Sequence, residues 1–132
     1  MKVAAAVASA ALLGACASHA ATPPVTTLTI SVYPSGLSAA PVHRYTLHCG
    51  PARGTVPDPS AACRVLARLA HPFAPTPPGT FCTDLAIGPD EAVIRGRLHG
   101  VKVHAQLKVQ GGCEIDRWRR VAAVVPGFPG RP

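Results

Sequence analysis

The sequence predicts an α+β domain in which one main helix packs on one face of an antiparallel sheet. Several short segments alternate apolar and polar residues, which is the pattern of strands with one solvated face. One segment between them has helical spacing instead. The chain has 132 residues with only 14% charged, and its 15 Pro and 12 Gly argue against long helices. These numbers leave room for one domain and argue against a multidomain enzyme, a coiled coil or a multi-span membrane protein.

The first two strands are predicted over residues 28–32 and 44–49. The first reads Leu-Thr-Ile-Ser-Val, which alternates strictly. In the second, Tyr45, Leu47 and Cys49 would share one face of the sheet. Residues 34–41 and 50–57 contain the Pro and Gly that are typical of loops and turns.

A helix is predicted to begin at Pro59, because Asp58 can cap it and Pro is favoured at the first helical position. Pro72 ends the run, and residues 72–79, with four prolines, are expected to be extended and stiff. Three apolar side chains would form the buried face of this helix: Ala62, Leu66 and Leu69.

Residues 92–98 and 101–109 are predicted to form a hairpin with Gly100 in its turn. The second of these segments alternates apolar and polar residues over its whole length. A last short strand is predicted over residues 120–125. The domain would then span residues 28–125, and residues 126–132 would form a flexible tail.

Residues 1–20 are predicted to be an export signal, since a lysine precedes an apolar run, Val3–Leu13, too short to span a bilayer. The run ends in Leu-Gly-Ala-Cys, which is similar to a bacterial lipobox in which Cys16 is acylated. The competing cleavage site after Ala20 would remove Cys16. Either route predicts a secreted or cell-envelope-anchored protein, with residues 21–27 as a linker and a membrane anchor where Cys16 carries a lipid.

Four cysteines remain once Cys16 is acylated or removed. In an oxidising compartment they are expected to form two disulfides, and three pairings are open. No two of them have the Cys-x-x-Cys spacing of a zinc or redox site, so no metal or cofactor is predicted. These cysteines are Cys49, Cys63, Cys82 and Cys113.

The segment from residue 49 to residue 63 reads Cys-Gly-Pro, then Gly-Thr-Val-Pro-Asp-Pro-Ser-Ala-Ala-Cys. With the strands before it and the later cysteines, it resembles the bacterial subtilisin inhibitor-like family, exported inhibitors of serine proteases. The resemblance covers roughly residues 28–125. It implies a five-stranded antiparallel sheet, the pairings Cys49–Cys63 and Cys82–Cys113, and homodimers that pair through their sheets.

The same resemblance implies a reactive loop just after the third cysteine. Carried onto this chain, the loop is Thr83, Asp84, Leu85 and Ala86, with Asp84–Leu85 as the reactive bond. Family members usually have Pro and a large apolar or basic residue where this chain has Thr83 and Asp84, and the stretch to Pro89 is one residue longer. A carboxylate suits an apolar specificity pocket badly. The target would therefore be a protease that prefers acidic residues, or a subtilisin-like protease if Leu85 takes the pocket.

Other constellations give no catalytic site. The six His form no helical pair with a nearby Glu, and no Gly-x-Ser-x-Gly occurs, so no enzyme is predicted. The basic run 117–120 could contact anionic lipid, whereas export argues against nucleic acid. Its plain interpretation is Trp118 partly packed on the sheet among three solvated Arg. The sequence thus predicts an exported serine protease inhibitor. The alternative is a cell-envelope lipoprotein module for binding or structure, without inhibition, on the same scaffold.

Overall fold

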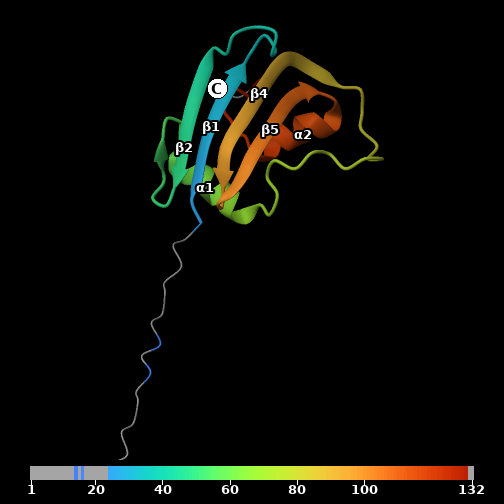
Figure 1. Ribbon diagram of the computed structural model, residues 1–132. Helices are drawn as coiled ribbons and strands as arrows, with labels where there is room; N and C mark the ends of the chain where they lie inside the picture. Colours follow the sequence, from blue (N-terminus) through green and yellow to red (C-terminus); the bar gives the residue numbers. More distant parts are fainter. Residues whose placement is uncertain (1–13, 15, 17–23, 131–132) are drawn as a thin grey trace, which may run out of the picture.

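The computed structural model describes Gly14, Cys16 and residues 24–130 (Figure 1). The predicted export signal lies outside these residues, apart from Gly14 and Cys16, which are both exposed. No helix in the described part of the chain is long and apolar enough to cross a membrane.

The fold is a five-stranded antiparallel sheet with two helices (Figure 1). The predicted sheet is confirmed, and a second helix accompanies the one that was predicted. The strands lie in the order β3-β2-β1-β4-β5, so β1 is central and β3 and β5 are the edges. Their bounds are β1 Thr26–Tyr33, β2 His43–Cys49, β3 Arg53–Gly54, β4 Ala86–Leu98 and β5 Val101–Gln110. The helices are α1 Pro59–Arg68 and α2 Gly112–Arg120.

The alternating segments form strands as predicted. In β1 the side chains of Leu28, Ile30 and Val32 are buried and their neighbours point to the other face. The β4–β5 hairpin turns through His99 and Gly100, which both have positive φ, of 48° and 80°. A two-residue turn with positive φ matches the twist of a hairpin, and this is the turn predicted at Gly100.

Helix α1 begins where the sequence predicts. The Asp58 carboxylate accepts a hydrogen bond from the backbone N–H of Ala61 at 2.9 Å, and Pro59 occupies the first turn. Ala62 and Leu66 are its buried residues. The helix thus packs on the sheet through the predicted face.

The predicted strand over residues 120–125 is wrong. Helix α2 ends at Arg120, and residues 121–125 form turns. Three residues at helical spacing, Ile115, Trp118 and Val121, are buried together, and this burial stabilises a helix where the Arg-rich composition concealed one. The fifth strand is instead the two-residue β3, which pairs with β2 inside a segment predicted as a turn.

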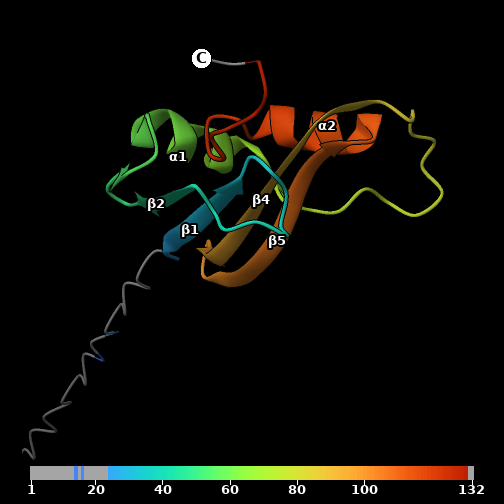
Figure 2. The same ribbon diagram turned by 90° about the horizontal axis from the view of Figure 1, so that it is seen from above.

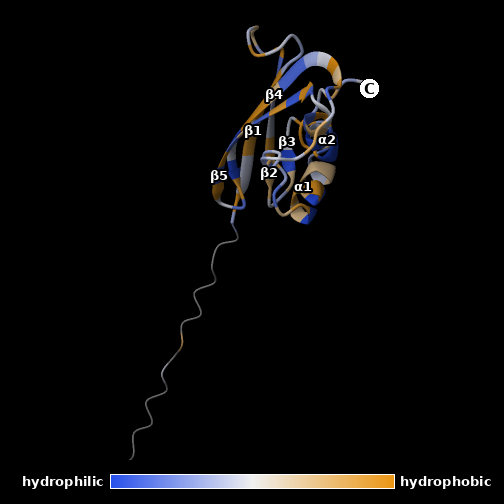
Figure 3. Cartoon of the chain, turned by 90° about the vertical axis from the view of Figure 1, so that its right-hand side faces the viewer, coloured by the Kyte–Doolittle hydropathy of each residue, from blue (hydrophilic) through white to orange (hydrophobic). Residues whose placement is uncertain are grey.

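Both helices lie along the same face of the sheet (Figures 2 and 3). The core fills the space between the helices and that face, and Trp118 is fully buried in it rather than partly packed. The indole N–H of Trp118 donates to the carbonyl of Val125 at 2.9 Å. Phe128 packs edge-on against Trp118, with ring centroids 6.1 Å apart, so the described chain beyond residue 125 contacts the core. Neither α1 nor α2 covers the opposite face of the sheet.

Candidate functional site

The two disulfides pair as the resemblance implies. Cys49 is bonded to Cys63 and joins the end of β2 to α1. Cys82 is bonded to Cys113 and joins the long α1–β4 connection to the first turn of α2. The predicted reactive residues therefore follow directly after a covalent crosslink.

The connection from residue 69 to residue 85 has no helix or strand, yet it is attached to the domain at several points. Phe73 is buried in the core. The Thr80 hydroxyl donates to the Pro77 carbonyl at 2.7 Å and closes a tight turn. Four prolines in residues 72–78 restrict the backbone further. The connection is thus restrained at several points along its length.

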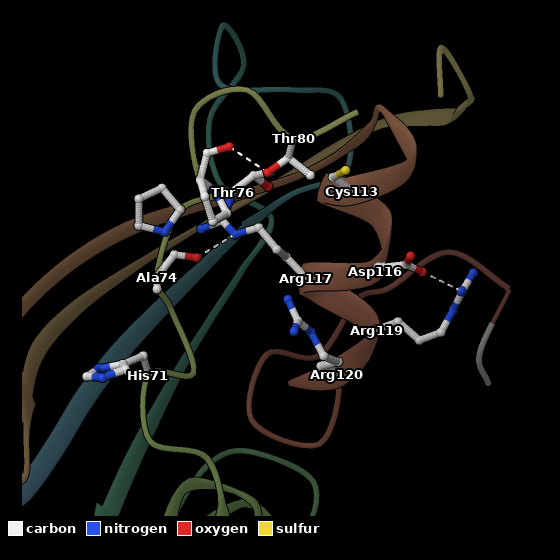
Figure 4. Close-up of a pocket in the computed structure, with 11 residues that line it drawn as sticks. His71, Ala74, Thr76, Thr80, Cys113, Asp116, Arg117, Arg119 and Arg120 are labelled. Carbon is white, nitrogen blue, oxygen red and sulfur yellow. Dashed lines mark hydrogen bonds and ion pairs between the residues drawn. The ribbon is translucent and has the colours of Figure 1, made fainter. Parts of the chain in front are cut away.

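Arg117 on α2 also contacts this connection, through its side chain (Figure 4). Its guanidinium donates to the carbonyls of Ala74, at 2.9 Å, and Phe73, at 3.2 Å, and forms an ion pair with Glu114. Glu114 also accepts from the hydroxyl of Thr76 at 3.2 Å. The side chain of Arg117 is only 8% exposed, so the interpretation of three solvated Arg is wrong for this residue. Arg117 has a structural role that its place in a basic run concealed.

Beyond Cys82, two backbone hydrogen bonds flank Asp84. The N–H of Gly112 donates to the carbonyl of Thr83 at 2.9 Å, and the N–H of Gly111 donates to the carbonyl of Leu85 at 2.6 Å. The carbonyls on both sides of Asp84 are therefore turned toward the domain. Asp84 itself is exposed between them.

Gly112 allows this close approach. A Cβ at position 112 would overlap the hydroxyl oxygen of Thr83, much closer than real contacts allow. The N–H of residue 112 can reach the loop because no side chain stands in the way. Neither Gly111, Gly112, Glu114 nor Arg117 was identified from the sequence as part of the site. The helical spacing of Ile115 and Trp118 is the signal that could have located them.

All four predicted reactive residues, Thr83, Asp84, Leu85 and Ala86, are exposed. Ala86 begins β4 and pairs with Gln110. Large apolar side chains stand on either side of Asp84: Phe81 is 92% exposed, Leu85 53% and Ile87 40%. The segment therefore presents one carboxylate among exposed apolar groups.

Strand β4 is irregular directly after the candidate loop. Ala86 pairs with Gln110 and Glu91 with Lys108, so residues 87–90 lie opposite the single residue Val109. This bulge begins directly after the loop.

A hollow of about 580 Å³ lies behind the loop, between residues 71–80 and α2 (Figure 4). Arg119 forms an ion pair with Asp116 at 2.8 Å on its exposed side. Within the described part of the chain, no three His, Cys, Asp or Glu side chains gather as a metal site would require. The exposed loop, rather than an enclosed cavity, is the candidate site.

No protein-family model and no curated protein matches this sequence. Among solved structures, the chain is similar to one from the crystal structure of Streptomyces caespitosus sermetstatin in complex with Bacillus licheniformis subtilisin. The two are 22% identical, the alignment covers 80% of this chain and 100% of the other, and the TM-score is 0.49.

Proposed function

We propose that this chain is an exported inhibitor of serine proteases that presents Asp84–Leu85 to the protease as a substrate would. The observation that carries the proposal is the pair of hydrogen bonds from Gly112 and Gly111 to the carbonyls of Thr83 and Leu85. They hold the backbone on each side of the bond to be attacked. The two disulfides suit an oxidising, extracytoplasmic compartment.

The mechanism follows from what happens after attack. The protease serine adds to the carbonyl carbon of Asp84, the Asp84–Leu85 bond breaks, and the amine of Leu85 takes a proton as it leaves. That amine cannot diffuse away, because the Leu85 carbonyl accepts a hydrogen bond from Gly111 and the chain continues into β4. On the other side, the Thr83 carbonyl accepts a hydrogen bond from Gly112, and Thr83 directly follows the Cys82–Cys113 disulfide. The amine stays beside the acyl-enzyme and the bond can re-form.

Rigidity also favours binding before any chemistry. An ordered loop loses less conformational entropy on entering a protease cleft than a flexible one does. Here the ordering comes from Arg117, from the disulfide and from the two glycine N–H groups, which together fix the loop from Phe73 to Leu85.

The geometry favours Asp84 over Leu85 as the residue that enters the specificity pocket. The Leu85 carbonyl is engaged by Gly111, so it points toward the domain, whereas Asp84 is exposed between the two engaged carbonyls. A protease with a cationic pocket would pair with the Asp84 carboxylate. In an apolar pocket, an unpaired carboxylate costs several kcal/mol, which corresponds to a loss of about a hundredfold or more in affinity.

The experiment is a titration of the purified protein against a Glu/Asp-specific serine protease, subtilisin and trypsin. We expect inhibition of the acid-specific protease at submicromolar concentration and at least about a hundredfold weaker inhibition of the other two. If none of the three is inhibited at micromolar protein, the inhibitor proposal fails. The non-inhibitory cell-envelope module would then be the better account of the scaffold.

A further inference from the structure

The net charge of the described residues arises on one face of the sheet. The described residues include eleven Lys and Arg and six Asp and Glu. One of these carboxylates, that of Glu91, lies on the face that neither helix covers. The remaining five basic and five acidic residues are elsewhere and cancel, so this face carries a formal charge of +5. Its six basic residues, called the basic face below, are Arg44, Arg53, Arg95, Arg97, Lys102 and Lys108.

The positive charge is densest at one end of the sheet. Cross-strand partners place Arg53, His48, Thr27, Arg97 and Lys102 in one row across all five strands. Neighbouring strands lie about 4.8 Å apart, so the row is roughly 20 Å wide. Three of its five members are permanent cations. The far end of the face holds Glu91, which accepts hydrogen bonds from Leu37 and Gln106.

The chain enters the sheet at this same end. The N–H of Gly100 donates to the carbonyl of Val25 at 2.8 Å, which sets the start of β1 beside the β4–β5 turn (Figure 1). Val25, just before β1, is 52% exposed, so an apolar side chain lies next to the row of cations. In sequence, only residues 17–23 separate Cys16 from Pro24, a reach of at most about 30 Å.

We propose that the basic face, led by Arg53, Arg97 and Lys102, docks on an anionic lipid bilayer. A surface of basic residues with a few exposed apolar ones is what the headgroup region of such a bilayer attracts, at roughly fivefold in affinity per Lys or Arg. We favour a lipid over another polyanion because β1 begins at the cationic end of the sheet. An acyl group on Cys16 would therefore hold this end at the membrane.

The docked orientation leaves the loop free. Strand β4 runs 13 residues from Ala86, at the loop, to Leu98, at the end where the chain enters. The loop therefore lies at the opposite end of the sheet from the row of cations (Figure 1). It also lies against α2, on the side of the helices (Figure 3). A domain seated on its basic face would present Asp84 away from the lipid.

The basic face is less suited to a second copy of the chain. The expected pairing of sheets would bring two faces of +5 together, and like charges at close range oppose association. Lipid phosphates supply the opposite charge.

The test is cosedimentation with vesicles at 0.1 M salt, using Cys16→Ser protein purified after export so that no acyl chain contributes. We expect binding to vesicles of phosphatidylglycerol and phosphatidylcholine and none to phosphatidylcholine alone. The double variant Arg97→Glu/Lys102→Glu should bind the anionic vesicles at least roughly 25-fold more weakly.

The control is Arg64→Glu/Arg68→Glu, which changes the charge equally on the exposed side of α1. It should lose much less affinity than the double variant of the face. An equal loss in both variants would show that net charge alone drives binding and would overturn the proposal. So would tighter binding of duplex DNA than of anionic vesicles at the same salt. Protease inhibition is measured separately and does not bear on these outcomes.

Discussion

The Nε of Arg117 donates to the carbonyl oxygen of Ala74 at 2.9 Å, across 43 residues of sequence. This bond joins α2 to the connection that leads into the candidate loop, and the same guanidinium reaches Phe73 and Glu114. The fork of an arginine can satisfy two carbonyls and a carboxylate at once, which the single ammonium of lysine cannot do with the same geometry.

Replacing Arg117 should therefore destabilise the domain. Arg117→Ala removes the ion-pair partner of the partly buried Glu114 and the donor to the carbonyls of Phe73 and Ala74. We expect a cost of about 3–5 kcal/mol in the free energy of unfolding. Arg117→Lys should recover only part of it. Urea unfolding measures both. Arg119→Ala is the control, since its ion pair with Asp116 is exposed and should contribute no more than about 1 kcal/mol. Equal losses at 117 and 119 would contradict the role given to Arg117.

Gly112 offers a prediction about function that is separate from stability. Gly112→Ala favours helix α2 by up to about 1 kcal/mol through propensity, but its Cβ would overlap the Thr83 hydroxyl, which must then move. We expect the variant to stay folded and to inhibit at least about tenfold more weakly. Both quantities are read from a melting curve and a protease titration.

A second substitution should restore what the first removes. Thr83→Ala deletes the hydroxyl that the new methyl group at position 112 would meet, and the nearest remaining atom, the Cβ of residue 83, lies at 3.5 Å, an ordinary contact. The double variant should then inhibit about as well as Thr83→Ala alone. Additive losses in this cycle would show that the approach of Gly112 to Thr83 is not what positions the loop.

The disulfides should differ in what their removal does. The chain-entropy model gives about 3 kcal/mol for Cys49–Cys63 and about 4 kcal/mol for Cys82–Cys113, whose separations are 14 and 31 residues. Only the second adjoins the loop. Ser substitution of Cys82 and Cys113 should turn the protein into a substrate, cut after Asp84 within the time that the wild type survives.

Mass spectrometry of the protein during incubation with the protease measures cleavage after Asp84 directly. Ser substitution of Cys49 and Cys63 is the matched control, and at a temperature where both variants are folded it should leave the loop resistant. Rapid cleavage of both variants would assign the resistance to global stability.

The elements predicted correctly are those whose signal is local. Strands β1 and β5 alternate over their lengths, and α1 has both a cap at Asp58 and an apolar face. Helix α2 was missed because most of its nine residues are polar, and β3, with two residues, is too short to carry a pattern. Strand β3 forms because its two residues pair with Leu47 and His48 of β2.

The candidate loop was predicted from the family resemblance, but the groups that hold it were not predicted. The bonds from Gly111 and Gly112 join positions that are 26 and 29 residues from their acceptors, Leu85 and Thr83. Only tertiary structure brings such groups together. The choice between Asp84 and Leu85 as the specificity residue was likewise open in the sequence. We favour Asp84 because the Leu85 carbonyl accepts a hydrogen bond from Gly111.

A lysine placed at either position tests that choice. If Asp84 enters the specificity pocket, Asp84→Lys should inhibit trypsin at least about a hundredfold more tightly than the wild type does, because a lysine there meets a pocket that binds cations. Leu85→Lys keeps Asp84 in place and should gain little. Its carbonyl is bonded to Gly111 and faces the domain, so attack at residue 85 would require that bond to break. Trypsin titration of both variants, with mass spectrometry of the cut, distinguishes the two positions. Inhibition gained by Leu85→Lys alone would move the reactive bond to Leu85–Ala86.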